Sequence, residues 1–147
     1  MEHFKYDPSV WGPHYWFMIH TIGFTYPHMP TTGQKKQYYN FFTSLPLFIP
    51  NKEIAMKFEV LLDENPISPY LTSQESLLKW IHFIHNKINK DLERKEKPYV
   101  EFVNDYINFY KPKELVFREE LKKRERIIYI CVIGGLTLYS LYKCKNN

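Results

Sequence analysis

The sequence predicts an all-α protein, a bundle of about five helices followed by a single C-terminal transmembrane helix. Two observations lead to this prediction. Apolar side chains recur every three or four residues through most of the chain, and no stretch alternates for long as a strand would. The stretch from Ile127 to Tyr142 contains no charged residue, and it follows enough chain for one folded domain.

The first three helices are marked by residues that favour helix starts. Pro13 suits the first turn of a helix running to about Thr25. Thr31 or Thr32 can cap a second helix, and Asn51 can cap a third. The apolar positions of the second and third helices are Tyr38, Phe41, Phe42 and Leu45, then Ile54, Phe58, Leu61 and Leu62.

Two further helices are expected before the C-terminal stretch. The segment Thr72-Ser73-Gln74-Glu75 has the capping-box pattern and opens a fourth helix. Pro98 opens a fifth, and residues 90–97 between them form a charged loop or a frayed helix end. The apolar positions of these two helices are Leu77, Leu78, Ile81, Ile84 and Ile88, then Tyr99, Phe102, Val103, Tyr106 and Tyr110.

The uncharged stretch from Ile127 to Tyr142 is expected to be a membrane anchor. As a helix it is about 24 Å long, which is short of a hydrocarbon core of about 30 Å. Arg126 and Lys143 can extend their charged ends to the interface on either side. The alternative, a buried core helix, is disfavoured because the stretch is apolar on every face and follows a complete domain.

Basic residues on either side of this stretch predict its orientation. Lys122, Lys123, Arg124 and Arg126 precede it, and only Lys143 and Lys145 follow it. The more basic flank marks the cytoplasmic side, so we expect a tail-anchored protein whose domain faces the cytoplasm. The expected organisation is a helical domain over 1–110, a basic helix or linker over 111–126, the anchor over 127–142 and a short tail over 143–147.

Composition excludes several classes of protein. Aromatic residues make up 18% of the chain, and the net charge of +4 comes from interspersed charges, which is unlike a disordered tail. Much of the basic excess lies between Lys111 and Arg126 rather than along a broad stripe, so no nucleic-acid partner is expected. Only Cys131 and Cys144 are present, so no disulfide framework is possible. Residues 1–10 lack the apolar run of a signal peptide.

Several motifs stand in order between Trp11 and Tyr106. The first is WGPHYWFMIHT at residues 11–21, followed by Tyr26-Pro27. Residues 80–89, WIHFIHNKIN, form the next, and Leu92 with Arg94 or Lys95 follows it. This ordered set resembles the Erv/ALR flavin-linked sulfhydryl oxidases, and the wording of residues 16–21 is most similar to the branch found in large DNA viruses.

The active-site segment of that family is altered in this chain. In the family it reads roughly Pro-Cys-x-x-Cys-x-x-x-Phe, and here Pro50 and Phe58 remain while Asn51 and Ile54 replace both cysteines. A thiolate at a helix N-terminus is stabilised by the unpaired amides and by the helix dipole. Asn51 can accept the same amide hydrogen bonds, but it cannot attack a disulfide or carry electrons. No catalytic residue is therefore expected.

The resemblance implies an FAD site between the helices. This chain has matching residues at the family positions that surround the flavin and at those that contact the adenine half of FAD. It also has a cation that could meet the pyrophosphate. Glu93-Arg94 stands where the family has Gly-Lys, so the phosphate contact departs from the pattern. The expected cofactor-binding residues are Trp16, His20, Tyr26, Trp80, His85, Asn86, Asn89, Arg94 and Lys95.

The residues alone leave other interpretations open. His20 and His85 can be core histidines, and His82 with His85 could supply two metal ligands, although no Cys or Glu at ligand spacing completes such a site. The sequence thus favours a membrane-anchored structural or adaptor protein of a large DNA virus that still holds FAD. The alternatives are an active thiol oxidoreductase that uses partner cysteines for virion disulfide formation, and a membrane scaffold without cofactor. We also expect a homodimer and viral structural proteins as partners. The expected location is a viral or host-derived internal membrane, or the virion.

Overall fold

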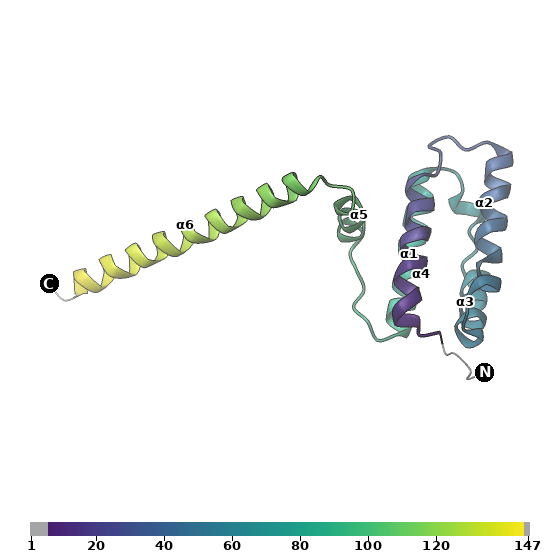
Figure 1. The fold of residues 1–147 in the computed structure, drawn as a ribbon, viewed down its shortest axis with the longest axis horizontal. Helices are drawn as coiled ribbons and strands as arrows, with labels where there is room; N and C mark the ends of the chain where they lie inside the picture. Colours follow the sequence, from purple (N-terminus) through teal and green to yellow (C-terminus); the bar gives the residue numbers. More distant parts are fainter. Residues whose placement is uncertain (1–5, 146–147) are drawn as a thin grey trace. The chain divides into compact units, whose positions relative to one another are not determined.

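The computed structural model describes residues 6–145, and these residues contain helices and no strand. Figure 1 shows the order of the elements along the chain. The chain divides into two compact units, one ending at Tyr106 and the other beginning at Ile107. The elements are α1 (Pro8–Phe24), α2 (Thr32–Ser44), the 3-10 helix η1 (Leu45–Phe48), α3 (Lys52–Glu64), the 3-10 helix η2 (Ser68–Tyr70), α4 (Gln74–Asp91), α5 (Tyr99–Asn108) and α6 (Lys113–Lys145).

Helix α1 begins earlier than its proline pattern suggested. Asp7 is the N-cap, its carboxylate accepts a hydrogen bond of 2.8 Å from the Ser9 amide, and Pro8 occupies the first turn. Pro13 lies inside the helix rather than at its start, so that prediction was wrong. The Asp-Pro pair supplies a side-chain cap and a fixed φ together, which Pro13 with Gly12 before it does not.

Helices α2 and α3 begin as their sequences predict. Thr31 caps α2 in a reciprocal capping box with Gln34, in which each residue's amide donates to the other's side chain. Asn51 caps α3, and its side-chain oxygen accepts a hydrogen bond of 3.1 Å from the Ile54 amide. Asparagine at position 51 is therefore structurally well suited to a helix start.

Helix α4 begins one residue later than its capping-box pattern suggested. Ser73, rather than Thr72, is the N-cap and accepts a hydrogen bond from the Ser76 amide. Glu75 does not complete a capping box, because it pairs with Lys79 one turn further along. At the other end of the helix Leu92 is the C-cap, and Glu93 follows it with a φ of 54°, a left-handed conformation that favours glycine.

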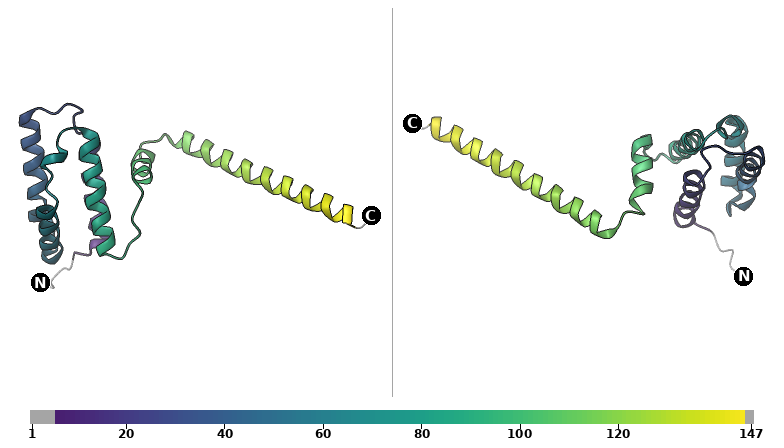
Figure 2. Two further views of the ribbon diagram at one scale, coloured as in Figure 1. Left: turned by 180° about the vertical axis from the view of Figure 1, so that it is seen from behind. Right: turned by 90° about the horizontal axis from the view of Figure 1, so that it is seen from above.

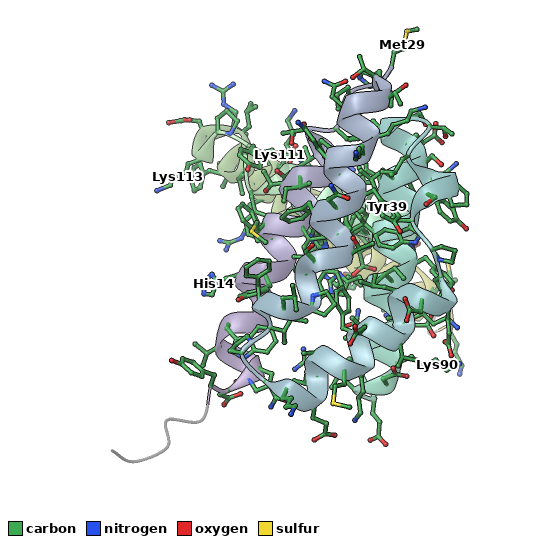
Figure 3. The ribbon with its side chains drawn as sticks, turned by 90° about the vertical axis from the view of Figure 1, so that its right-hand side faces the viewer. His14, Met29, Tyr39, Lys90, Lys111 and Lys113 are labelled. Carbon is green, nitrogen blue, oxygen red and sulfur yellow. The ribbon has the colours of Figure 1, made fainter. Side chains whose placement is uncertain are left out.

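The core of the first unit is built around α4, which packs along α1. Figures 1 and 2 show these helices side by side, and Figure 3 shows side chains filling the space between helices while Met29, on the loop after α1, points outward. Gly23 permits the close approach, because a Cβ there would lie 2.6 Å from Ile81 Cδ1 and 3.0 Å from Leu78 Cδ2. The core side chains of α4 are Leu77, Leu78, Trp80, Ile81 and Ile84.

The second unit consists mainly of α6, one unbroken helix from Lys113 to Lys145 (Figure 2). It contains the basic segment before Arg126, the uncharged stretch and the start of the tail, so the basic segment is helix rather than irregular linker. Within residues 6–145 it is the one helix long and apolar enough to cross a membrane, by length and composition, and none of its apolar window is buried. Residues 1–5 and 146–147, which include part of the segment examined for a signal peptide and the end of the tail, lie outside the described residues.

Candidate functional site

Three rings from two helices form the centre of the candidate site. Trp16 and His20 lie on α1, and His85 lies on α4. The His85 ring stacks on the Trp16 indole with centroids 3.9 Å apart and planes 9° from parallel. His20 Nε2 lies 3.2 Å from His85 Nδ1, which is a hydrogen bond whose donor depends on the tautomer. Phe102 of α5 meets His20 edge-on at 4.7 Å. The structure therefore brings together three of the predicted residues.

Both imidazoles of this cluster are held in the neutral form. Burial is the main cause of the low pKa of His20, about 4, and the positive charge of Lys97 adds to it. Burial also lowers the pKa of His85 to about 3, with further contributions from His20 and Lys97. A neutral imidazole can donate one hydrogen bond and accept another, and it presents an uncharged ring face for stacking.

The side chains of Asn86 and His82 contact the backbone of Lys97 rather than the three rings of the cluster. The Asn86 amide group donates to the Lys97 carbonyl at 2.8 Å and accepts from the Lys97 amide at 3.0 Å. His82 Nε2 lies 2.7 Å from the same carbonyl. These contacts hold the loop after α4 against that helix and fix the start of α5, so Asn86 uses its side chain within the protein.

Asn89 is the polar residue among the buried side chains of the described range, and it is only 8% exposed. It lies one helical turn beyond His85 on α4, on the same face. Its amide therefore places a donor and an acceptor at this end of the cluster.

Tyr26 and Trp80 lie in the hydrophobic core. The Tyr26 ring is 1% exposed and its hydroxyl donates to the Leu71 carbonyl at 2.9 Å. The Trp80 indole is 2% exposed and donates to the Asn65 carbonyl at 3.0 Å. Both rings are almost fully enclosed by protein, so neither presents a face to a ligand.

The two candidate cations lie on the exposed loop after α4. Arg94 directly follows the left-handed residue Glu93, and its backbone amide donates a hydrogen bond of 2.7 Å to the Asn89 carbonyl. Both Arg94 and Lys95 are exposed, and their charged groups are free to reach an anion. Glu93 thus adopts the backbone conformation that the glycine of the family pattern would favour.

The two positions that lack cysteine lie at the start of α3, and both side chains are partly buried. The preceding η1 helix is tied to α1 by the Tyr15 hydroxyl, which donates to the Phe48 carbonyl at 2.7 Å. Tyr15 and Phe102 are site-building residues that the motifs did not identify. Tyr15 lies inside the first motif, but only its contact with a carbonyl distant in sequence reveals its role.

The described residues contain no group of three or more side chains suited to a metal ion. His82 and His85 have different partners, the Lys97 carbonyl and the Trp16–His20 pair. The arrangement instead offers stacked rings, neutral imidazoles, a buried amide and nearby cations. That combination suits a flat heteroaromatic ligand that carries phosphate.

Sequence comparisons relate this chain to a family of redox proteins. The model of the Erv1 / Alr family matches residues 13–107. The chain is 31% identical over 109 residues to a probable FAD-linked sulfhydryl oxidase of Acanthamoeba polyphaga mimivirus, covering 74% of this chain and 76% of that protein. It is 35% identical over 91 residues to the mitochondrial FAD-linked sulfhydryl oxidase Erv1 of Saccharomyces cerevisiae, covering 60% of this chain and 46% of that protein.

Solved structures agree with the sequence comparisons. The crystal structure of the yeast Erv1 core superposes with a TM-score of 0.62 at 27% identity, covering 76% of this chain and 89% of that one. The FAD-binding domain of yeast Erv1 gives a TM-score of 0.61 at 29% identity, covering 65% and 89%. The helical bundle thus has its counterpart in known proteins, and this chain belongs to the Erv1 / Alr family.

Proposed function

We propose that this chain is an FAD-binding member of its family that has no thiol oxidase activity of its own and acts as a membrane-anchored structural or adaptor protein. One observation carries the proposal. Asn51 and Ile54 stand at the start of α3 where the family has its dithiol, and the two cysteines of the chain, Cys131 and Cys144, both lie in α6.

The donor set supports FAD as the ligand. Trp16 and His85 stack on each other and remain partly exposed, so a flat ligand could extend the stack. His20 and His85 are neutral, so they accept or donate hydrogen bonds without a charge penalty. Asn89 offers a side-chain amide one turn beyond His85, and Arg94 and Lys95 supply positive charge for the diphosphate. Bound FAD would supply a two-electron redox centre, and the residues named here would bind and orient it.

The proposed loss of oxidase activity follows from the chemistry of the missing groups. Oxidation of a dithiol by a flavin begins with thiolate attack, which needs a sulfur beside the flavin. Asn51 fills the helix start with a cap, and Ile54 is an aliphatic side chain, so neither can form a disulfide. Leu47 and Phe48, 83% and 66% exposed, make the surface before Asn51 apolar, which suits contact with another protein.

The α6 helix supports anchoring in a membrane. Tyr129 lies near the start of its uncharged stretch, and Tyr139 and Tyr142 lie near the end, as aromatic residues do at the two interfaces of a bilayer. The basic residues before Ile127 favour a cytoplasmic domain. The relatives from mimivirus and from Invertebrate iridescent virus 3 support a viral setting, and within it we propose a viral or host-derived internal membrane.

The experiment that tests the proposal is a spectrum followed by an oxidase assay on the full chain in detergent. We expect a yellow protein with a flavin spectrum that produces hydrogen peroxide from dithiothreitol no faster than free FAD does. A flavin-loaded chain with clear turnover would support the working oxidase instead. A colourless chain whose melting curve does not respond to added FAD would exclude the cofactor and leave a scaffold, because a ligand at 100 times its Kd stabilises by about 2.7 kcal/mol.

A further inference from the structure

Helix α6 carries a charged surface immediately before its uncharged stretch. A shallow hollow on this surface is lined by Lys122, Lys123, Arg126, Glu119 and Ile127. Lys122 and Arg126 are four residues apart and therefore lie on one face of the helix, and Lys123 and Ile127 are related in the same way. The hollow thus joins three cations to the first residue of the apolar stretch.

The three cations are not used within the protein. Among residues 6–145 none of them forms an ion pair. Glu119, the acidic side chain in the hollow, is instead paired with Lys111, whose Nζ lies 3.1 and 3.3 Å from its two carboxylate oxygens. The hollow is therefore positively charged and open to an anionic ligand.

The depth of these residues along the helix identifies the ligand. At about 1.5 Å per residue, Arg126 lies about 1.5 Å before Ile127, and Lys123 and Lys122 lie about 6 and 7.5 Å before it. The headgroup layer on each side of the hydrocarbon core is about 5–7.5 Å thick. If the hydrocarbon begins at Ile127, all three cations lie among the lipid phosphates, and the apolar wall of the hollow lies beside the acyl chains.

We propose that Lys122, Lys123 and Arg126 form a binding site for the headgroup of an anionic phospholipid. The inference rests on the proposed membrane anchoring and adds the class of lipid to it. A phosphate that is attached to hydrocarbon matches a site in which cations adjoin an apolar side chain, whereas a soluble anion would make no use of Ile127. A cation at this depth contributes enough to change affinity about fivefold.

Native mass spectrometry of the lipids that stay bound to the chain tests the proposal. The full chain is purified in detergent and supplied with equal amounts of phosphatidylserine and phosphatidylcholine. The test variant is the triple substitution Lys122→Gln, Lys123→Gln and Arg126→Gln. The matched control is Lys113→Gln, Arg118→Gln and Arg124→Gln, which removes the same charge from the same helix. Lys113 and Arg118 lie further from Ile127, and Arg124 lies on another face of the helix.

We expect the wild-type chain and the control to retain phosphatidylserine in preference to phosphatidylcholine, and the test variant to lose at least about fivefold of that preference. Equal losses in both variants, or no preference in the wild type, would overturn the lipid site. Displacement of phosphatidylserine by inorganic phosphate alone would assign the hollow to a soluble anion and overturn it as well.

A separate measurement distinguishes this site from the anchor itself. Carbonate extraction of membranes reports whether the full chain is embedded, whatever lipid it prefers. If the wild type and both variants stay in the pellet while the lipid preference is absent, the anchor stands and the site is wrong. If the wild type is released by carbonate, the proposed anchoring fails and the site fails with it.

Discussion

His20 and His85 share a hydrogen bond while both imidazoles are neutral, and this makes the stability of the fold depend on pH. Their pKa values in the fold, about 4 and about 3, lie below the usual 6.5, so the unfolded chain binds protons that the folded chain does not. Stability is therefore fully present above pH 6.5 and falls as the pH is lowered toward 4, by at most about 1.4 kcal/mol per pH unit for each imidazole.

Thermal unfolding between pH 7 and pH 5 measures this effect, because the carboxylates titrate mostly below that range. We expect the melting temperature of the wild type to fall across it. The variant His20→Gln with His85→Gln should start lower and show a flatter pH dependence. Parallel curves for the two proteins would show that the pair does not govern the titration.

Glu93 presents a second prediction that concerns one residue. Its φ of 54° is left-handed, and such a conformation costs a side-chain-bearing residue about 1–2 kcal/mol. Glu93→Gly should therefore stabilise the fold, by about 0.5–1 kcal/mol after the greater freedom of glycine in the unfolded chain is included. Denaturant unfolding measures the change. Glu93→Ala removes the same charge but keeps the strain, so a similar gain with alanine would attribute the effect to charge.

The sequence predicted single residues best where a side chain acts on its own neighbours. Asn51 caps α3 through the amide three residues along, and that contact follows from its type and place. Asn86 could not be understood this way, because its partner is the backbone of Lys97 on the far side of a loop. The stack of Trp16 on His85 likewise depends on how two helices pack. The family resemblance assigned both residues to the cofactor site, but it did not predict that their rings contact each other.

At the scale of the element, the proposed loss of oxidase activity concerns the start of α3, where Pro50 and Phe58 match the family pattern and Asn51 and Ile54 do not. The double change Asn51→Cys with Ile54→Cys should restore part of the thiol oxidase activity if FAD is bound. The first change removes a cap worth about 1 kcal/mol, and the second leaves a space at a cost of about 1–2 kcal/mol. Oxygen uptake with dithiothreitol should rise in the double variant alone, since one thiol cannot complete a dithiol–disulfide cycle.

The two single variants serve as controls for this experiment, and the flavin spectrum shows that each protein is loaded. A double variant that holds FAD and stays inert would show that the start of α3 does not face the flavin. The family frame would then be retained in sequence but not in geometry.

The helices themselves were predictable to different degrees. Caps and periodicity located the starts of α2 and α3, because their signals are local. The start of α1 was missed because Pro8 and Pro13 both suit the first turn of a helix, and the side-chain cap that Asp7 supplies before Pro8 was not considered. The start of α4 was missed because two adjacent hydroxyl residues, Thr72 and Ser73, can each serve as a cap.

At the scale of the molecule, the all-α bundle followed from the spacing of apolar residues, and the family resemblance added that the bundle holds a flavin between its helices. The pairing of α1 with α4 is a property that no local pattern contains. It depends on Gly23, which appears in the sequence as an ordinary glycine inside a helix. Only the positions of Ile81 and Leu78 show that an added side chain at this position would force its neighbours to shift.

Gly23 therefore allows α1 and α4, the two helices that carry the ring cluster, to pack closely. Gly23→Ala adds one methyl group, which should push α1 and α4 apart. We expect overpacking to cost about 1–3 kcal/mol, whereas the better helix propensity of alanine returns at most about 1 kcal/mol. The fold should therefore be less stable, and FAD retention should weaken. Gly33→Ala, in α2 with open space around it, should stabilise instead. If both variants behave alike in thermal melts and in flavin content, the spacing is not critical. If they differ as expected, the close approach of α1 to α4, which lets Trp16 stack on His85, depends on the absence of a side chain at position 23.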